Sequence, residues 1–371
     1  MIQSSIRSGD SRACLIRDAV LITWDEAPMT SKAVLSCMEE VCHISMHSNT
    51  LFGGKTVILL GDFRQTCPIV QRGSKQDVLH ASIKHSPLWA DFQQFRLTQR
   101  IRHAEDQGYA DFLDAVGDGM GPTVNLSILH IAQQRTDLIN FVFPDSVILD
   151  PMLCMKRAIL AVTNAQIDLY NADILHRLTG ASRLYMAADS LDETDTDYNA
   201  NTSPIPYASV LDYVARHPPI GVPPSALYVK VGGLYRIMRN FSIDRGLVKN
   251  ARVLVTDVGM RLINIRLLRD DDSIQDEDIL LPRITFTSRL PSQHTLIRKQ
   301  FPIAPAYATT FNSCQGLTLD RMAIDVSKPA FSHGQLYTAL SRIRRRNDGM
   351  VYMGPKESDS TLNVTYEELL L

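Results

Sequence analysis

The sequence predicts an α/β protein in which short parallel strands are covered by helices, with a small β-barrel-like insert. Residues 20–23 and 56–60 form two short apolar strands, and polar residues follow each of them directly. Between them, residues 30–47 repeat apolar side chains at intervals of three and four, which is the spacing of a helix buried on one face. Strands of nearly all apolar residues that alternate with helices are typical of parallel sheets. In such sheets ligands bind beyond the carboxyl ends of the strands, where these polar residues stand.

The same alternation returns further along the chain. Residues 158–162 predict a strand, the helix after it runs through residue 175, and another strand is predicted at 322–326. Residues 227–286 contain strand-like segments separated by glycines and an acidic turn, which predicts the barrel-like insert. Residues 187–206 are acidic and rich in turn formers, so we interpret them as a surface loop or linker.

Length and composition limit the class of protein. The chain of 371 residues can form two or three domains, and 45% hydrophobic with 21% charged residues is an ordinary globular composition. The net charge of −2 gives no global signal for nucleic acid, although a protein can confine positive charge to a channel. The six cysteines are scattered without a C-x-x-C motif, which indicates reduced thiols. No apolar run approaches the roughly 18 residues of a membrane span, so we expect a soluble intracellular protein with no membrane partner.

A pair of acids, Asp25 and Glu26, follows the first strand. An aspartate at the end of a buried strand can hold Mg²⁺ through water, and an adjacent glutamate can polarise an attacking water. With Ala27 and Pro28, the same residues would also make a good first turn of a helix. From these residues alone, a magnesium site and a helix cap both remain open.

A nucleotide-driven motor also needs a phosphate-binding loop of the form G-x-x-x-x-G-K-[ST], and no such segment precedes Asp25. Residues 53–56 read Gly-Gly-Lys-Thr and imitate the end of such a loop. A phosphate-binding loop must follow a strand and open a helix, whereas Lys55 precedes a strand and comes after the acidic pair. We therefore predict that Lys55 does not bind phosphate.

The segment 61–65 (Gly-Asp-Phe-Arg-Gln) follows the second strand directly. Beside the acidic pair, Gln65 could read the γ-phosphate of a nucleotide or position a water, while Asp62 and Arg64 could pair with each other. A tight turn with a surface salt bridge is the alternative interpretation.

Two further arginines stand where phosphate recognition is plausible from their chemistry. Arg102 ends the segment 97–102, and Arg342 ends the run Ala-Leu-Ser-Arg. A guanidinium is a rigid, permanently charged fork, and such an arginine contributes on the order of 10³–10⁵ in rate where it has been measured. Because lone arginines are usually solvated, a surface role for either one also remains open. Residues 344–346 predict a surface basic patch that could meet a DNA backbone.

The order and spacing of these motifs resemble those of the PIF-like branch of superfamily 1B DNA helicases. Within that branch they are most similar to the helicases of Helitron-type rolling-circle transposons, and the likeness spans about residues 10–353. The segments that carry it are Asp25–Met29, Phe52–Lys55, Gly61–Gln65, Ser86–Trp89, Leu97–Arg102, Ala158–Ala161 with Asn164, Gly246–Asn250, Leu281–Ile284, Thr309–Gly316 and Phe331–Arg342.

The resemblance implies an ATP-dependent helicase that moves 5′ to 3′ on single-stranded DNA and unwinds duplex DNA. It implies a nuclear protein with roles in DNA repair, recombination and telomere maintenance or in Helitron transposition. The implied fold consists of RecA-like parallel sheets with helices on both faces and a small SH3-like β-barrel. The implied division is a partial first RecA-like domain (1–96), a second one in two parts (97–206 and 291–371), and a 2B-like barrel insert (207–290).

The resemblance also implies a role for each motif residue, with ATP and Mg²⁺ as the cofactors. Asp25 would bind Mg²⁺, Glu26 would act as the general base, and Gln65 would contact the γ-phosphate. Arg102 and Arg342 would be the arginine pair that completes the catalytic and ATP-binding set. The residues that would couple the nucleotide state to DNA are Gln315, Gly316 and Thr318, and those that would lie near the DNA strand are Asn164, Thr310, Asn312 and His333.

The chain departs from the family pattern at several points. Residues 312–316 read Asn-Ser-Cys-Gln-Gly where Asn-Lys-Ser-Gln-Gly is usual, Arg100 replaces an asparagine, and residues 248–251 lack the usual Cys-Asn-Gly-Thr. The largest departure is the missing phosphate-binding loop, whose absence would also leave the first sheet with an exposed edge.

Two hypotheses follow. In the first, the gene product is a working helicase whose N-terminal region lies outside these 371 residues. In the second, the chain is an inactive transposon-derived remnant that at most binds single-stranded DNA. For the chain as written, we predict ATP hydrolysis near background.

Overall fold

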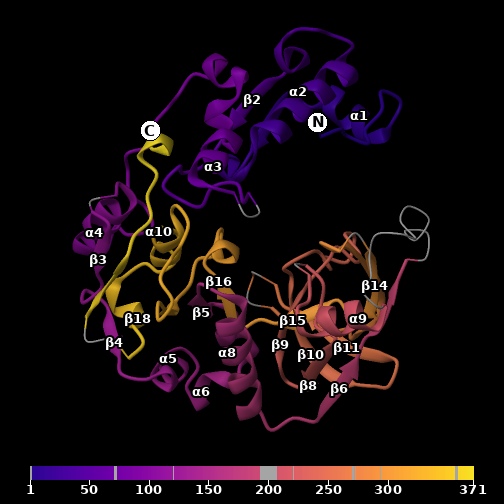
Figure 1. Cartoon of the computed structure of the whole chain (residues 1–371), viewed down its shortest axis with the longest axis vertical. Helices are drawn as coiled ribbons and strands as arrows, with labels where there is room; N and C mark the ends of the chain where they lie inside the picture. Colours follow the sequence, from indigo (N-terminus) through magenta and orange to yellow (C-terminus); the bar gives the residue numbers. More distant parts are fainter. Residues whose placement is uncertain are drawn as a thin grey trace. The chain divides into compact units, whose positions relative to one another are not determined.

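In the computed structural model the chain forms two compact units (Figure 1). Unit one comprises residues 1–132, 311–318 and 325–371, and unit two comprises residues 133–310 and 319–324. The structure describes every residue except 1, 71, 72, 120, 193–206, 220, 270, 272, 293, 356 and 357. The four-part division implied by the family resemblance stays a prediction, and its boundary at residue 206 lies outside the described residues.

The first part of unit one is a two-stranded parallel sheet, as the apolar pattern predicted. β1 (Leu21–Trp24) pairs with β2 (Thr56–Leu59) over their whole lengths. Both strands alternate between exposed and partly buried residues, which differs from the burial expected of a fully covered parallel sheet. The reason is that the inward residues of both strands pack on the cluster that includes Leu35 of α2 (Lys32–Met46), whereas their neighbours face away from it. These inward residues are Ile22, Trp24, Val57 and Leu59.

The rest of unit one consists of short elements from both ends of the chain. α10 (Gln335–Leu340) is buried along its entire length, and α4 (Gln107–Gly117) contacts it. β18 (Gly349–Tyr352) pairs in parallel with β4 (His130–Ala132), and β19 (Ser360–Leu362) pairs antiparallel with β3 (Thr123–Asn125). The remaining helices of this unit are α1 (Ser11–Asp18) and α3 (Lys75–Ala81), with short 3-10 turns at 27–29, 51–54, 83–85, 87–91, 312–314, 346–348 and 367–369.

Unit two begins with an α/β part built around β5 (Arg157–Ala161). β16 (Ala308–Thr310) lies parallel to β5 on one side, and β17 (Arg321–Asp325) lies on its other side. α8 (Asn164–Arg177) follows β5 and starts with a capping box, in which Thr163 and Gln166 bond reciprocally to the backbone. The other helices of this part are α5 (Arg135–Val142), α6 (Asp145–Ile148) and α7 (Pro151–Met155). The predicted strands and helix therefore form here, and four of the five β5 residues are buried.

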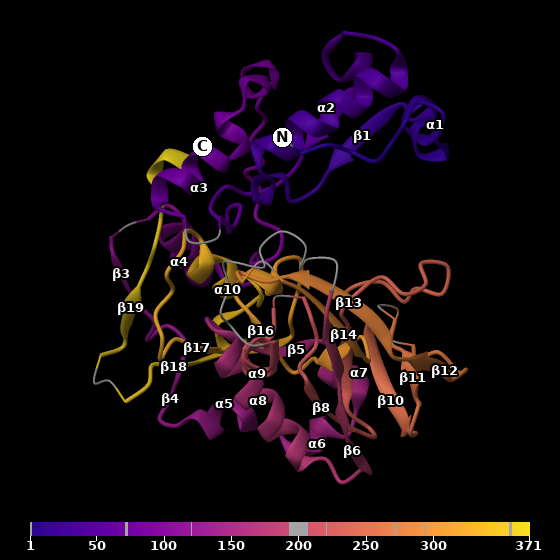
Figure 2. The ribbon, with the colours of Figure 1, turned by 45° about the vertical axis from the view of Figure 1, so that its right-hand side comes forward.

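The second part of unit two, where the sequence predicted strands of a barrel-like insert, is built of antiparallel strands (Figure 2). One sheet has the order β12-β11-β10-β9-β15, and a second has the order β13-β14-β7. A third pair joins β6 and β8. The strand bounds are β6 Ser182–Met186, β7 Ala188–Leu191, β8 Ala226–Lys230, β9 Leu234–Ile237, β10 Arg252–Val258, β11 Leu262–Leu267, β12 Ile279–Pro282, β13 Ile284–Arg289, β14 Thr295–Gln300 and β15 Ile303–Pro305. That this part is an SH3-like barrel stays a prediction.

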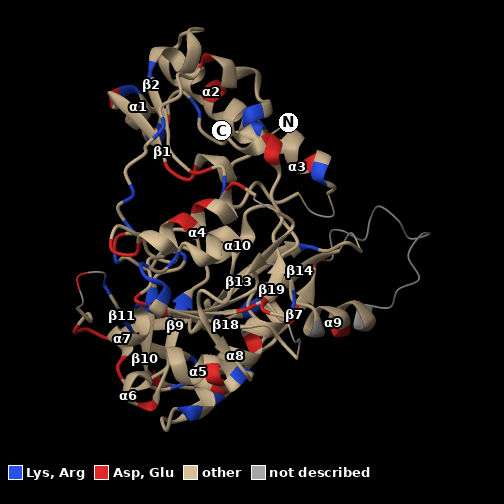
Figure 3. Ribbon diagram, turned by 90° about the vertical axis from the view of Figure 1, so that its left-hand side faces the viewer, with Lys and Arg blue, Asp and Glu red and all other residues tan. Residues whose placement is uncertain are grey.

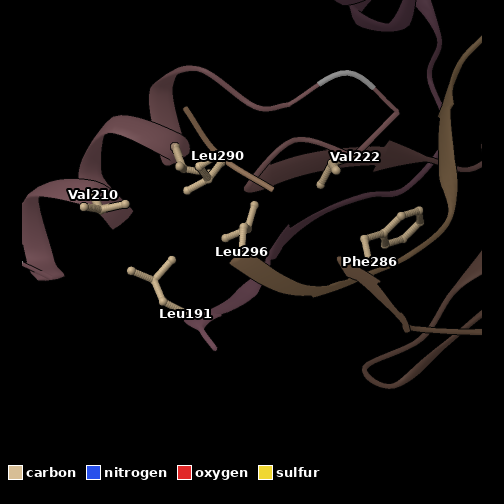
Figure 4. Close-up of a cluster of buried hydrophobic side chains, with 7 residues drawn as sticks. Leu191, Val210, Val222, Phe286, Leu290 and Leu296 are labelled. Carbon is tan, nitrogen blue, oxygen red and sulfur yellow. The ribbon is translucent and has the colours of Figure 1, made fainter. Parts of the chain in front are cut away.

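The interpretation of residues 187–206 as a loop is wrong at its start. Residues 188–191 form β7, because Leu191 can be buried in a core beneath α9 (Tyr207–Arg216) while Asp189 pairs with a buried arginine. Figure 4 shows this core, in which side chains of β7, α9, β13 and β14 meet. The core consists of Leu191, Val210, Val214, Val222, Phe286, Leu290 and Leu296. The rest of that interpretation, for residues 193–206, lies outside the described residues.

Candidate nucleotide site

The acidic pair stands in a strained turn at the carboxyl end of β1. Glu26 has φ 53° and ψ 35°, a left-handed conformation that typically costs about 1–3 kcal/mol for a residue with a side chain. The turn is held on both sides by Leu60, whose N–H donates to the Trp24 carbonyl at 2.8 Å and whose carbonyl accepts from Ala27 at 2.9 Å. The Asp25 carboxylate also accepts from the Glu26 N–H at 2.8 Å. The helix-cap alternative is not realised for these side chains, because neither of them caps the 3-10 turn that follows.

Glu26 is joined to a residue from the far end of the chain. The Gln315 side-chain amide donates from Nε2 to Glu26 Oε2 at 2.5 Å, and Gln315 Oε1 accepts from the Thr66 hydroxyl at 3.0 Å. The Thr66 N–H in turn donates to Thr338 Oγ1 at 3.2 Å. Because Thr66 occupies the oxygen of the Gln315 amide, the NH₂ group of that amide is directed at Glu26. All four residues belong to unit one.

Gln65 lies one residue before Thr66 and has an unsatisfied acceptor. Its Oε1 atom is buried and has no hydrogen-bond partner within the described part of the chain. A buried polar atom without a partner costs about 1–3 kcal/mol, so such atoms are rare in stable cores. An orphaned buried side-chain oxygen fits a place where a ligand or its water donates a hydrogen bond.

The two predicted arginines lie close together in unit one. Arg102 donates to the Ser341 carbonyl at 3.0 Å and to Thr318 Oγ1 at 3.2 Å. Burial lowers the pKa of Arg102, and the nearby charge of Arg342 lowers it further, while Glu26 acts in the opposite direction. The structure therefore brings Glu26, Gln315, Arg102 and Arg342 into one electrostatic neighbourhood.

Arg342 is a buried cation that is solvated by protein oxygens. Only 2% of its surface is exposed, and its guanidinium donates to the Thr338 carbonyl at 2.8 Å and to Ser341 Oγ at 2.7 Å. A weaker contact reaches the Leu317 carbonyl at 3.4 Å. Among the described residues Arg342 has no carboxylate within salt-bridge distance, so its charge is available to a bound anion. The backbone turn next to it needs Gly316, whose φ is +80°.

The residues expected near DNA are placed in both units. In unit one, Asn312 accepts from Gln335 Nε2 at 3.0 Å. In unit two, Asn164 is the exposed first residue of α8 and Thr310 is the last residue of β16, directly opposite Ala161 of β5. Asn164 and Thr310 therefore lie at carboxyl ends of neighbouring parallel strands, which is where ligands bind in such sheets.

His333 occupies a different environment from that of an open DNA surface. It is 0% exposed, its Nε2 bonds to the Phe63 carbonyl at 2.8 Å, and its Nδ1 accepts from the Tyr366 N–H at 2.8 Å. The His333 ring also stacks on the Tyr366 ring with centroids 5.3 Å apart. Burial lowers the pKa of His333. Its contacts give it a structural role, and a role at the DNA strand stays a prediction.

The charged residues around this site are largely paired. Arg64 contacts Asp62 at 3.2 Å and Asp114 at 2.8 Å, which confirms the pairing of Asp62 with Arg64, and these carboxylates help to raise its pKa. Asp114 belongs to α4, whose acidic residues are drawn red in Figure 3. In the predicted basic patch, Arg345 pairs with Glu105 and Arg346 with Asp106. Arg100, which departs from the family pattern, pairs with Asp111 at 2.7 Å and with Asp114.

Lys55 is not available to a phosphate. Its ammonium donates to the carbonyls of Arg17 at 2.6 Å and Ala19 at 2.7 Å, at the end of α1. Phe52 and Gly53, which precede it, have left-handed φ values, and Lys55 leads into β2 instead of a helix. This geometry agrees with the prediction that the segment is not a phosphate-binding loop.

The donor set fits part of a Mg²⁺–nucleotide site. Within the part of the chain that the structure describes, no three His, Cys, Asp or Glu side chains gather to hold a metal ion. Mg²⁺ is usually held by one or two carboxylates together with waters and substrate phosphates, so the exposed Asp25 carboxylate suffices on the protein side. That Gln65, Arg102 and Arg342 meet the γ-phosphate stays a prediction, and the ammonium of Lys55 is bound to backbone carbonyls instead of forming part of a phosphate cradle.

Sequence reasoning missed the supporting residues Thr66, Thr338 and Ser341. Thr66 carries a weak signal, since it directly follows the predicted phosphate-reading Gln65. Thr338 and Ser341 lie in the motif that ends at Arg342, and their roles follow only from the fold.

Comparison with known proteins finds similar sequences among DNA helicases. Residues 1–125 match a family described as PIF1-like helicase. The chain is 25% identical over 324 residues to the ATP-dependent DNA helicase PIF1 of Danio rerio, and 27% identical over 323 residues to that of Homo sapiens. Each alignment covers 86% of this chain but 44% of the relative, so the chain spans less than half the length of these curated relatives.

A solved structure has the same fold. The crystal structure of Bacteroides Pif1 bound to ssDNA superposes with a TM-score of 0.69 at 20% identity, covering 100% of this chain and 76% of that one. The fold is thus the α/β, RecA-like type found in Pif1 helicase structures. By sequence, the chain is similar to the PIF1-like helicases. Among the described residues, no helix combines the length and apolar character that crossing a membrane requires.

Proposed function

We propose that this chain carries the motor residues of an ATP-dependent DNA helicase, in which ATP hydrolysis drives 5′ to 3′ movement on single-stranded DNA and unwinding of duplex DNA. The curated relatives are named ATP-dependent DNA helicases, which supports this activity class. The observation that carries the proposal is the contact of Glu26 with Gln315, with Arg102 and Arg342 beside it. It joins a strand-end acid to a segment 289 residues away, as a nucleotide site that signals to DNA requires.

In this proposal each residue of the site has one task. Asp25 holds Mg²⁺, and bound Mg²⁺–ATP supplies the phosphoryl group that is transferred to water. Glu26 takes up the proton of that water, and the Gln65 amide orients the water or the γ-phosphate. Arg102 and Arg342 offset negative charge that develops on the phosphate oxygens.

Gln315 would communicate between the nucleotide and DNA. In the structure its amide donates to Oε2 of the Glu26 carboxylate, which ties the position of the proposed general base to this segment while other lone pairs of the carboxylate can still accept a proton. The neighbouring Asn312 lies in the same loop and is proposed to meet the DNA backbone. In unit two, Asn164 and Thr310 are proposed to contact single-stranded DNA. In unit one, His333 is proposed to position the loop that contains Phe63.

The finer biological assignments are also proposals. They place the protein in the nucleus, in DNA repair, recombination and telomere maintenance or in Helitron transposition. We further propose the domain division 1–96, 97–206, 207–290 and 291–371, with strands β9 to β12 as the core of the 2B-like barrel.

A second function, an inactive remnant that binds single-stranded DNA, is favoured by one observation. The ammonium of Lys55, in the segment that imitates the end of a phosphate-binding loop, donates to two backbone carbonyls. Reading the transcript and genomic DNA upstream of the Met1 codon separates the two functions. An in-frame phosphate-binding loop supports the helicase, whereas stop codons or unrelated sequence support the remnant.

If that loop is found, the longer product provides a direct test of the residue roles. Glu26→Gln should abolish DNA-stimulated ATP hydrolysis and leave binding of single-stranded DNA intact. Glu40→Gln, an exposed position on α2, is the matched control and should hydrolyse ATP like the unaltered protein. Full turnover by the Glu26→Gln protein would reject Glu26 as the general base.

A further inference from the structure

Two arginines face each other on the antiparallel sheet of unit two. Arg236 of β9 and Arg252 of β10 are direct partners in the strand register, so their side chains project from the same face. On the other side of Arg236, the partner in β15 is the small residue Ala304, which leaves space beside the guanidinium. Like charges directly opposite each other destabilise a sheet, so this pair calls for a compensating partner.

The protein compensates this pair incompletely. The Arg252 guanidinium donates to the Ala306 carbonyl at 2.5 Å, and Arg236 reaches Asn250 Oδ1 at 3.4 Å. Among the described residues, neither forms an ion pair with a carboxylate within 4.0 Å, and both side chains are half-buried. Burial and the charge of Arg236 lower the pKa of Arg252 to about 10, while Asp168 is the one carboxylate whose charge favours Arg236.

Other arginines of the same unit have their positive charge balanced by a carboxylate. Arg298 is completely buried, and its guanidinium contacts both carboxylate oxygens of Asp189 at 2.7 and 2.6 Å. Arg266, on the adjacent strand β11, contacts Asp278 at 2.6 Å. The excess positive charge at Arg236 and Arg252 is therefore a local feature of this site.

The pair lies beside the segments that lead to the predicted DNA contacts of this unit. Asp168 stands one turn after Asn164 on α8, and residues four apart share a helix face. Asn171 of the same helix accepts from the backbone N–H groups of Tyr307 at 3.1 Å and Ala308 at 3.0 Å. Those residues continue from Ala306, the partner of Arg252, into the strand that ends at Thr310.

We propose that Arg236 and Arg252 form a phosphate-binding site that holds one phosphodiester group of single-stranded DNA. The planar guanidinium fork matches two phosphate oxygens, and two forks from opposite strands can hold one phosphate between them. The phosphate neutralises the like-charge pair, and the strand then continues toward Asn164 and Thr310. The DNA source of the phosphate rests on the proposed function, whereas the phosphate site itself rests on the arginine geometry.

The first test measures binding of a fluorescein-labelled 20-nucleotide oligo(dT) by anisotropy between 50 and 200 mM salt. Each phosphate neutralised on a single strand contributes about 0.7 to the slope of log K against log salt, so Arg236→Gln/Arg252→Gln, which removes one phosphate site, should lower the slope by about 0.7. Arg266→Gln removes a paired arginine from the same sheet and should leave the slope unchanged. Unchanged slope and affinity in the double variant would overturn the site.

A second test separates this site from the proposed function. If the unaltered chain fails to bind oligo(dT) at 50 mM salt, the DNA proposal fails, and thermal unfolding is then measured in inorganic phosphate against chloride at equal ionic strength. Selective stabilisation of the unaltered chain, absent in the double variant, keeps the site with free phosphate as its ligand. Equal responses of both proteins to phosphate would reject it.

A stability control excludes a merely structural role. Without DNA or phosphate, Arg252→Gln should unfold at the same or a higher temperature, because it removes the like-charge contact with Arg236. A marked fall in the unfolding temperature would mean that Arg252 mainly stabilises the fold through its hydrogen bond to the Ala306 carbonyl. If the glutamine variants fail to fold, Arg236→Lys/Arg252→Lys provides the test, because lysine keeps the charge but lacks the planar guanidinium. This variant should retain the slope of log K against log salt but bind oligo(dT) more weakly. An affinity equal to that of the unaltered chain would reject the phosphate site.

Discussion

Two parallel-strand regions of the molecule carry proposed functional residues at their carboxyl ends, yet they are buried to different degrees. In β5 of unit two, Ile159 and Leu160 are 0% exposed. In the β1 and β2 pair of unit one, Leu21 is 44% exposed and Ile58 is 41% exposed. The turn of the acidic pair after β1 is nevertheless held by backbone hydrogen bonds to Leu60, and the residues after β5 are held by the capping box of α8.

The difference shows that covering one face of a sheet is enough to place a functional turn. The inward residues of β1 and β2 pack with Leu35 and Phe52, and the backbone bonds at Leu60 then define the turn of Asp25 and Glu26. The outward residues take no part in this, so the two faces of the sheet should respond differently to substitution.

The largest expected effect is at the buried strand. Ile159→Ala should lower the free energy of unfolding of unit two by about 2–5 kcal/mol, because it leaves a cavity in a fully packed core. Ile58→Ala, the same change on the exposed face of β2, should cost less than about 1 kcal/mol. Urea unfolding followed by circular dichroism measures the stability of both variants. An equal loss of unfolding free energy in both would show that the two regions are equally well packed.

A smaller effect is expected from acid. Burial lowers the folded-state pKa of His333 below its ordinary 6.5, so the fold favours the neutral ring. The stabilisation is complete above about pH 6.5 and is lost as the pH falls toward the lower folded pKa, by at most about 1.4 kcal/mol per pH unit. Asp62 and Glu368 oppose the shift, and His103 adds a loss of the same sign.

The variant His333→Gln isolates this contribution. It should be less stable at neutral pH because it loses ring packing against Tyr366, and its stability should fall less steeply between pH 6.5 and 5 than that of the unaltered chain. His103 is present in both proteins and cancels in the difference. Identical pH slopes in urea unfolding experiments would show that His333 is not held neutral.

A further test concerns the hydroxyl that orients Gln315. Thr66→Val keeps the shape of the side chain but removes the donor to Gln315 Oε1, and a hydrogen bond of this kind contributes about 0.5–1.5 kcal/mol. The unfolding midpoint of unit one should drop accordingly. Ser82→Ala removes a hydroxyl that only caps a nearby turn, and it should leave the mobility of the Gln315 amide unchanged in NMR spectra. An amide of Gln315 that is equally ordered in both variants would contradict the orienting role of Thr66.

The smallest effect is expected on the outward face of β1. Leu21→Thr should change the free energy of unfolding by no more than about 0.5 kcal/mol, because threonine suits a strand and this side chain is largely exposed. Its solubility at high concentration should rise, since an exposed apolar residue is removed. A loss of several kcal/mol in urea unfolding would show that this face is packed.

The local parts of this account could be read from the sequence. The apolar runs predicted β1, β2, β5 and β17 to within about one residue, because a strand buried on at least one face needs such residues. The pairing of Asp62 with Arg64 was also predictable, since the two are adjacent in one turn. The extent to which each strand is buried could not be predicted, because the same apolar run suits a sheet that is covered on one face or on both.

The long-range contacts of the site could not be predicted from spacing. Thr66 and Glu26 reach Gln315 across 249 and 289 residues, and only the fold brings them together. The burial of His333 was hidden because it stands between a serine and a glycine, as a loop residue would. The pairing of Arg236 with Arg252 depends on strand register, which composition does not reveal.

The most direct test of the central claim is the rate of ATP hydrolysis by the 371-residue chain with and without oligo(dT). The site contains Glu26, Gln65, Arg102 and Arg342 but no glycine-rich loop for the β-phosphate, so we predict a rate at background under both conditions. DNA-stimulated turnover that is abolished by Glu26→Gln and retained by Glu40→Gln would contradict this account.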